Sequence, residues 1–221
     1  LLAEPRVLHR IPENVSFEQA AMTEPFAVAY TGVVERAEIK PGDVVVVQGA
    51  GTIGQLAAQM ARLRGAGTVV MLGTAIDEAR LAKAREMGVD ITVDITSEDA
   101  NAIIAGLGDG LGAHVVIEAT GVSIALKQSL EIVRPYGQIV KIGWGPQPLN
   151  FSLDPLVAKA VTLSGSFSHT WTTWEAVLSM FSTGRLETDK VLGGVYPLDE
   201  WEEAFEAMES GRNVKSVMVF S

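Results

Sequence analysis

The chain has 221 residues, of which 48% are hydrophobic and 20% charged, enough apolar material for the core of one large domain or of one and a half smaller ones. Its formal net charge of −10 argues against nucleic acid as a partner, because no basic surface could follow a phosphate backbone. Cysteine is absent, no apolar run approaches the roughly 20 residues of a membrane span, and no secretory signal pattern opens the chain, so we expect a soluble cytoplasmic protein without membrane contact.

Residues 1–25 show little helical periodicity and end in Thr23-Glu24-Pro25. Glu24 precedes a proline at the start of an expected helix, where the positive end of the helix dipole favours a carboxylate. From its local context alone, Glu24 is a helix-start residue.

Three glycines lie between the first clear strand and the first clear helix. Val44–Val47 is a continuous β-branched run, typical of a strand that is buried on both faces of a parallel sheet. A G-x-G-x-x-G pattern follows it, at Gly49, Gly51 and Gly54. In this context the first glycine permits a tight turn, the second lets a pyrophosphate approach the main chain, and the third lets the helix pack on the strand.

The first turn of the helix that follows contains Thr52 and Ile53. The free N–H groups of this turn, with the helix dipole behind them, would hold the charge of a phosphate. A structural turn without a ligand is the alternative interpretation of the three glycines.

Strands and helices alternate along the rest of the middle segment. The expected strands are Thr68–Leu72, Ile91–Val93, His114–Glu118 and Gln138–Ile142. The expected helices run from about Asp77 to Met87 with Gly88 closing it, from a cap at Ser97 to Ala105, and from Ser123 to Val133, before a turn at Pro135–Gly137. Such alternation indicates parallel β-α-β units with right-handed crossovers. We predict an α/β fold with a Rossmann-type doubly wound parallel sheet over residues 40–166.

The C-terminal segment, residues 167–221, has a different pattern. An aromatic-rich loop precedes an expected helix near Trp174–Thr183, an amphipathic helix near Leu198–Ser210 and a final β-rich run, VKSVMVF. This segment and residues 1–39 look like the two ends of a second domain.

Ligands bind at the carboxyl ends of the strands in open α/β sheets, and this selects further cofactor candidates. The residues at three such strand ends are Gly73-Thr74, Thr120-Gly121 and Gly143-Trp144. A plain turn is the alternative for each pair.

Three stretches resemble the zinc-dependent medium-chain alcohol and polyol dehydrogenases, in the branch of sorbitol and threonine dehydrogenases. They are RIPENVSFEQAAMTEPFAVAYTGVVERAEIKPGDVVVVQGAGTIGQLAAQMARLRGAG, VVIEATGVSIALKQSLEIVRPYGQIVKIGW and YPLDEWEEAFEAMESGRNVKSVMVF. The resemblance implies that residues 1–39 and 167–221 are remnants of a GroES-like catalytic domain, at both ends of a cofactor domain. In this family that catalytic domain begins with a zinc-binding Cys and a Gly-His-Glu motif, which do not occur here, so we expect a fragment or a truncated protein.

The resemblance also implies roles for single residues. Glu24 matches a residue at the catalytic zinc, either a ligand or a partner of the zinc-bound water, and a carboxylate oxygen suits that role. Ser166-Phe167 matches the segment whose backbone meets the nicotinamide amide. Lys215 matches a cation near the pyrophosphate. A plain turn and an exposed lysine remain the alternatives for the last two.

The sequence departs from NAD-selective members of this family at the end of the second strand. These members have a carboxylate there that binds the adenosine ribose. Here Gly73–Ala75 occupy the position, and Asp77 and Glu78 follow slightly later. Arg80 matches an adenosine-contacting cation and could attract a 2′-phosphate, or it could be an exposed helical charge that pairs with neighbouring acids. NAD and NADP therefore both stay open as the cofactor.

The function that the resemblance implies is hydride transfer between a secondary alcohol, a polyol or sugar alcohol, and NAD(P). In the complete protein zinc would polarise the hydroxyl group. The alternatives are a zinc-free quinone or enone reductase of the same superfamily and a non-catalytic NAD(P)-binding module. By itself, the chain is expected to be inactive.

The resemblance further implies a homodimer or homotetramer that forms through the edge of the cofactor sheet. The candidate edge is Ala160–Ser166, where alternation of Val161 and Leu163 predicts one buried face. Of the histidines, His9 and His114 are expected to be structural, and His169 is a candidate for lining the substrate cleft.

Overall fold

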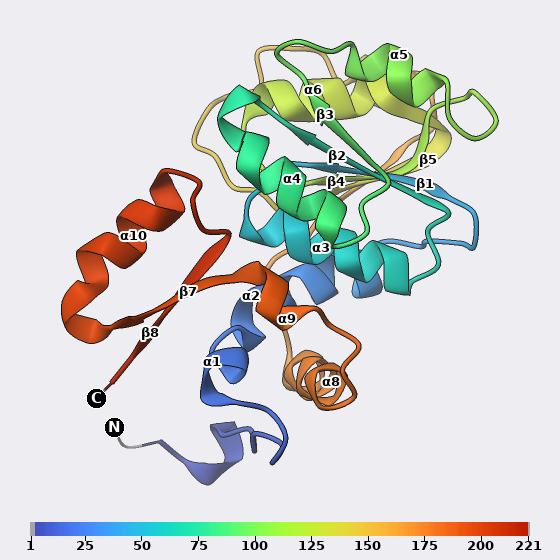
Figure 1. The fold of residues 1–221 in the computed structure, drawn as a ribbon. Coiled ribbons are helices and arrows are strands. Elements are labelled where there is room, and N and C mark those ends of the chain that lie inside the picture. Colours follow the sequence, from blue (N-terminus) through green and yellow to red (C-terminus); the bar gives the residue numbers. More distant parts are fainter. Residues whose placement is uncertain (1–2, 221) are drawn as a thin grey trace.

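The structure, a computed structural model, describes residues 3–220 and contains a six-stranded parallel sheet. The sheet order is β3-β2-β1-β4-β5-β6 (Figure 1), which is the 3-2-1-4-5-6 order of dinucleotide-binding folds. The strands are β1 (Val44–Gln48), β2 (Thr68–Gly73), β3 (Ile91–Asp94), β4 (Ala113–Glu118), β5 (Val133–Lys141) and β6 (Thr162–Gly165). The predicted Rossmann-type fold class is confirmed.

Helices cover both faces of this sheet (Figure 1). One face carries α2 (Thr23–Tyr30), α3 (Thr52–Leu63) and α4 (Glu78–Glu86). The other face carries α5 (Ala100–Ala105), α6 (Ser123–Ile132) and α7 (Asp154–Ala158). Two short helical turns precede α2, namely η1 (Pro5–Val7) and α1 (Phe17–Ala20), while η2 (Thr31–Glu35) follows α2 and η3 (Ala75–Asp77) leads into α4.

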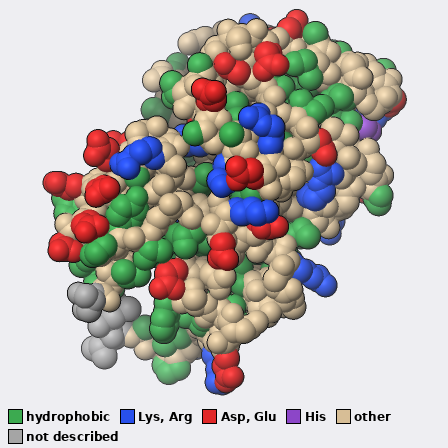
Figure 2. Space-filling view, viewed as in Figure 1, with side chains coloured by type: hydrophobic (Ala, Val, Ile, Leu, Met, Phe, Trp, Pro, Cys, Tyr) green, Lys and Arg blue, Asp and Glu red, His purple; other side chains and the backbone are tan. Residues whose placement is uncertain are grey.

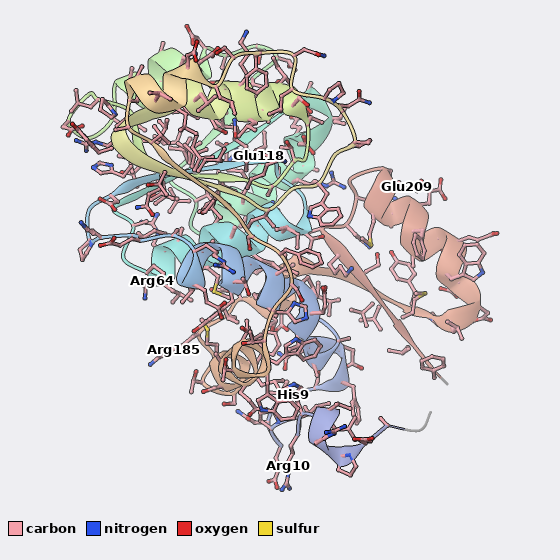
Figure 3. All side chains as sticks on the ribbon, turned by 180° about the vertical axis from the view of Figure 1, so that it is seen from behind. His9, Arg10, Arg64, Glu118, Arg185 and Glu209 are labelled. Carbon is pink, nitrogen blue, oxygen red and sulfur yellow. The ribbon has the colours of Figure 1, made fainter. Side chains whose placement is uncertain are left out.

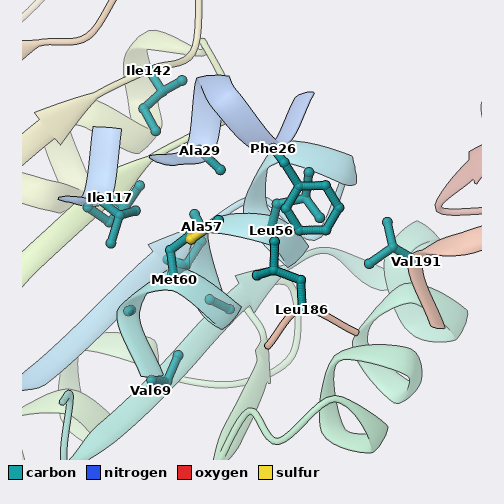
Figure 4. Packing of buried hydrophobic residues seen from close by; sticks show 14 of the residues in the cluster. Phe26, Ala29, Leu56, Ala57, Met60, Val69, Ile117, Ile142, Leu186 and Val191 are labelled. Carbon is teal, nitrogen blue, oxygen red and sulfur yellow. The ribbon is translucent and has the colours of Figure 1, made fainter. Parts of the chain in front are cut away.

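The three layers explain why Val44–Val47 of β1 are all apolar instead of alternating with polar residues. Val45 and Val47 belong to the core beneath α2 and α3, and Val46 belongs to the core beneath α5 and α6. Every residue of β1 is buried. In the first core Phe26 and Met60 are fully buried, side by side with Leu56 (Figure 4).

The C-terminal segment forms two further parts. Helix α8 (Trp171–Ser182) packs on α2, and α9 (Thr188–Val191) leads into a two-stranded parallel sheet. The strands β7 (Leu192–Pro197) and β8 (Lys215–Val219) are joined by η4 (Leu198–Glu200) and α10 (Trp201–Glu209). We call residues 192–219 the C-terminal unit. It lies to one side of the main sheet (Figure 1), and acidic side chains gather over it (Figure 2).

Several local predictions differ from the structure. The cap of α5 is Asp99, whose side chain accepts from the N–H of Ala102, and Ser97 instead donates to Asp94. The helix predicted near Trp174–Thr183 begins three residues earlier, where Thr170 and Thr173 cap each other. Strand β5 begins at Val133, and the expected turn is a left-handed residue, Tyr136 (φ 58°), within it.

The predicted alternation along the edge strand is wrong. Val161 is buried, but its N–H donates to the carbonyl of Leu156, and it precedes β6. Leu163 is 36% exposed. Strand β6 is nevertheless at the edge of the sheet, paired with β5 alone among residues 3–220.

Residues 1, 2 and 221, at the outer ends of the predicted segments 1–39 and 167–221, lie outside the described residues. Within residues 3–220, no helix has the length and apolar character to cross a membrane.

Candidate functional site

The three glycines between β1 and α3 have three different environments. Gly49 has φ +99°, a conformation that other residues rarely adopt. A Cβ at Gly54 would overlap the carbonyl oxygen of Gly49, so only glycine lets α3 start this close to β1. A Cβ at Gly51, in contrast, would meet no atom within 4 Å. Packing explains Gly54 and backbone conformation explains Gly49, but neither explains Gly51, which borders open space.

The N-terminus of α3 faces this open space with its donors uncommitted. Gly51 is the N-cap and supplies no side chain, and the first turn contains no acidic residue. The N–H groups of Thr52 and Ile53 have no acceptor within the helix, as at every helix start. The hydroxyl of Thr52 donates to the carbonyl of Val214 at 2.6 Å. This bond brings the start of β8, and hence Lys215, next to the first turn of α3.

A cleft of about 650 Å³ opens at the carboxyl ends of β1, β2 and β4. It runs between the glycine turn and the helices α5 and α6, whose residues Asn101 and Gln128 are on its wall. Of the predicted site residues it gathers Gly49, Gly73, Thr74 and Thr120.

Arg80 does not project freely into this cleft. Its guanidinium donates to Asp77 at 3.1 Å and to the carbonyl of Met208 at 2.5 Å, and its side chain is 19% exposed. Asp77 also accepts from the N–H and the hydroxyl of Thr74, at 3.1 and 3.0 Å. The interpretation of Arg80 as an exposed helical charge is therefore wrong, and its pairing with a neighbouring acid is correct.

A second cleft, of about 740 Å³, lies at the carboxyl ends of β5 and β6. It gathers the predicted residues Gly143, Trp144, Ser166 and Phe167. The rings of Trp144 and Phe167 are 5.4 Å apart, and both side chains are largely exposed.

The loops after β4 and β5 cross closely between the two clefts. A Cβ at Gly121 would overlap the backbone of Trp144, and a Cβ at Gly143 would overlap the backbone of Gly121. The crossing explains both glycines by packing alone.

An ion pair between a buried carboxylate and a partly exposed lysine, which the sequence did not reveal, supports this crossing. Glu118, which is labelled in Figure 3, is 0% exposed and accepts from Lys141 at 2.8 Å. The same carboxylate accepts from the N–H groups of Thr120 and Gly121 at 2.7 and 2.8 Å, and Lys141 also donates to the carbonyl of Gly143. A charge inside each of two apolar runs, VVIEATG and QIVKIG, is the signal that could have revealed the pair.

Glu24 lies in the first turn of α2, as expected, and its side chain is exposed. Within residues 3–220, no three His, Cys, Asp or Glu side chains come together as a metal ion would require. The residues present therefore do not form a zinc site by themselves.

The histidines lie away from the glycine turn. His9, which is labelled in Figure 3, packs on Trp171 (3.8 Å between ring centroids) and contacts Glu175. His114 accepts from the N–H of Val44. Both contacts are structural, as expected. His169 lies 5.4 Å from Trp174.

Comparisons with known proteins agree with this architecture. Residues 52–183 match the family described as zinc-binding dehydrogenase. Sorbitol dehydrogenase of Halalkalibacterium halodurans is 35% identical over 99% of this chain, which covers 63% of that protein. The crystal structure of 2R,3R-butanediol dehydrogenase from Bacillus subtilis superposes with a TM-score of 0.85 at 30% identity, over 95% of this chain and 60% of that one.

A third relative was solved with a nucleotide. It is a zinc-binding dehydrogenase from Sinorhizobium meliloti bound to NADP, with a TM-score of 0.83 at 26% identity, over 96% of this chain and 62% of that one. The chain thus spans about three fifths of the length of the relatives it matches. The family match over more than half of its residues shows that the chain belongs to the zinc-binding dehydrogenase family.

Proposed function

We propose that this chain is the cofactor-binding portion of an NAD(P)-dependent, zinc-type alcohol dehydrogenase. The complete protein would transfer a hydride between a secondary alcohol, a polyol or sugar alcohol, and the nicotinamide ring. The names of its relatives, which include sorbitol, D-arabitol-phosphate and 2R,3R-butanediol dehydrogenases, support this substrate class.

The observation that carries the proposal is the environment of Gly51. Open space in front of an uncapped helix N-terminus is where a pyrophosphate would lie, since N–H groups and the helix dipole both favour an anion there. The cleft at Gly73, Thr74 and Thr120 would take the adenosine, and the cleft at Trp144 and Phe167 the nicotinamide. Lys215, beside the first turn of α3, would offset phosphate charge.

A binding measurement tests this assignment. NADH is titrated into the chain, and binding is followed by calorimetry and by energy transfer from tryptophan to NADH. Gly51→Val puts a branched side chain into the space proposed for the pyrophosphate, while its Cβ meets no protein atom. We expect the variant to fold and to lose binding by about 100-fold or more, as loss of several phosphate contacts implies. Equal affinities would rule out this site.

The matched control is Gly88→Ala, outside both clefts. Gly88 has φ +88° at the end of α4, and a Cβ there would meet no atom within 4 Å. Its substitution should lower stability through backbone strain and leave the NADH affinity unchanged.

Glu24 is the one residue of this chain to which the proposal gives a role at the zinc site. Glu24 would contribute one carboxylate to a metal site whose other ligands lie in the complete protein, since the described residues do not gather a ligand set. We therefore expect the pure chain to bind no stoichiometric zinc and to oxidise no alcohol. Metal analysis after dialysis, together with assays on sorbitol and threonine, would contradict this by finding one zinc per chain or turnover.

The domain division is part of the same proposal. Residues 40–166 would form the cofactor domain, which the extent of the sheet from β1 to β6 supports. Residues 1–39 and 167–221 would belong with the catalytic domain.

We further propose that two copies pair through β6. Ser166 N–H donates to Lys141 of β5, so by the two-residue period of a strand the N–H of Leu163 points to the free edge. Isologous pairing would satisfy such groups symmetrically. Sedimentation at micromolar concentration should show a dimer, and Leu163→Pro should give a monomer. A monomeric wild-type chain would refute the pairing.

A further inference from the structure

The adenosine end of the first cleft contains a carboxylate that is held in place by three donors. Asp77 lines this cleft, and its side chain is 15% exposed. One oxygen accepts from the N–H and the hydroxyl of Thr74, and the other accepts from Arg80. Asp77 comes from η3, after the end of β2, and folds back to the strand end.

These three donors are the groups that a 2′-phosphate would need. A backbone N–H, a hydroxyl and a guanidinium are the usual ligands of a phosphate. Here all three are bound to Asp77, and the second arm of Arg80 is bound to Met208. A phosphate would have to displace a carboxylate that is tethered to the same turn, and the two anions would repel each other if both remained.

The charged side chains around the cleft also disfavour a 2′-phosphate. Besides Asp77, its lining includes three acidic residues, Glu98, Asp99 and Glu131, and one basic residue, Lys127. With Arg80 included, four acidic and two basic side chains surround the cleft, and this excess of acidic groups penalises an added phosphate dianion more than a neutral hydroxyl.

A ribose hydroxyl, in contrast, suits the carboxylate as it stands. An ionised carboxylate has about four acceptor positions, and three are used by Thr74 and Arg80. The remaining position can accept a hydrogen bond from a hydroxyl group. We propose that Asp77 makes this site selective for a dinucleotide with a free 2′-hydroxyl, NAD, over its 2′-phosphorylated form, NADP. The inference rests on the proposed function, because it assumes that a dinucleotide occupies the cleft.

Two ligands and two variants test the proposal. The full chain is titrated with NAD⁺ and with NADP⁺ at low ionic strength, as wild type and as Asp77→Asn. The asparagine can still accept from the N–H of Thr74, but it loses the charge and frees Arg80. We expect the wild type to bind NAD⁺ at least about tenfold more tightly than NADP⁺, and Asp77→Asn to reduce this ratio about tenfold or reverse it. The gain in NADP⁺ affinity should shrink as salt is added.

Asp154→Asn is the control for an acidic residue in the first turn of a helix outside the cleft, and it should leave both affinities unchanged. If Asp77 is only structural, Asp77→Asn will lower both affinities together, which overturns the selectivity proposal. A wild type that binds NADP⁺ as tightly as NAD⁺ also overturns it. If neither nucleotide binds to the folded wild type, the proposed function itself fails. Thermal unfolding of Asp77→Asn and of a second variant, Asp77→Ser, shows whether each of them folds. If Asp77→Asn does not fold, the two affinities are measured on Asp77→Ser instead.

Discussion

Two units of this chain, β1-α3-β2 and β7-α10-β8, have the same β-α-β connectivity but differ at the N-terminus of their helix. Between β1 and α3 the chain turns through glycines, and the first turn of α3 has no acidic residue. Between β7 and α10 it passes through Pro197 and η4, and the first turn of α10 contains Glu202 and Glu203. The dipole of α10 is thus already offset by carboxylates, and that of α3 is left for an external anion.

The units also differ in burial. All residues of β1 are buried between two helical layers, whereas β7 alternates between half-buried and exposed residues. Trp201 and Phe205 of α10 remain about half exposed. The proposed nucleotide site therefore rests on three features of the first unit that the second unit lacks: the glycine turn, the free helix end and the helical layers on both faces of the strand.

The largest expected effect on stability comes from a substitution in the glycine turn between β1 and α3. Gly54→Ala would force a methyl group into the carbonyl of Gly49 and push α3 away from β1. We expect a loss of at least about 3 kcal/mol in the free energy of unfolding, measured by urea denaturation. Gly51→Ala, with open space around its Cβ, should cost less than about 1 kcal/mol. Equal midpoints for the two variants would show that the three glycines are not distinct in role.

The Glu118–Lys141 pair is expected to have the next largest effect. Lys141→Met leaves the buried carboxylate of Glu118 without its cation, and we expect a loss of about 3 kcal/mol in unfolding free energy. Adding Glu118→Gln should recover part of this loss, because no unpaired charge then remains. Additive effects of the two substitutions in a double-mutant cycle would contradict direct coupling. In the described part of the C-terminal unit, no ion pair joins β7 to β8.

A third variant gives α3 the character of α10. Gly51→Asp places a carboxylate at the N-cap, where aspartate is a favourable residue and where the backbone is extended (φ −71°, ψ −175°). We expect the free energy of unfolding to change by less than about 1 kcal/mol, while NADH binding is lost through repulsion of the pyrophosphate. Loss of folding together with binding would remove this variant as support for an anion site.

The smallest expected effect on stability concerns α10, whose first turn already contains two carboxylates. Replacing Glu202 and Glu203 by glutamine should destabilise α10 by only about 0.3–1 kcal/mol per charge, less at high salt. Hydrogen exchange of the α10 amides, at 20 mM and 500 mM salt, measures the difference. The NADH affinity should not change, and a change would place α10 electrically within the nucleotide site.

The sequence predicted the order of strands and helices from Val44 to Ile142 because each of these elements carries its own periodicity, but it did not predict α7, α9 or β7. It could not predict contacts between distant segments. The Glu118–Lys141 pair, the bond from Arg80 to Met208 and the burial of Val161 all depend on which strands and loops become neighbours. The choice between Ser97 and Asp99 as the cap of α5 was local but ambiguous, since both residue types are good caps.

Two hydrogen bonds join residues 40–166 to the C-terminal unit. Thr52, in the first turn of α3, donates to the carbonyl of Val214, and Arg80, paired with Asp77, donates to the carbonyl of Met208. We therefore expect a ligand that fixes Thr52 and Arg80 to strengthen the attachment of the C-terminal unit. By reciprocity, any change that detaches this unit would lower the affinity of the ligand by the same factor. The nucleotide would then act as a clamp on a segment that lies outside its own binding cleft.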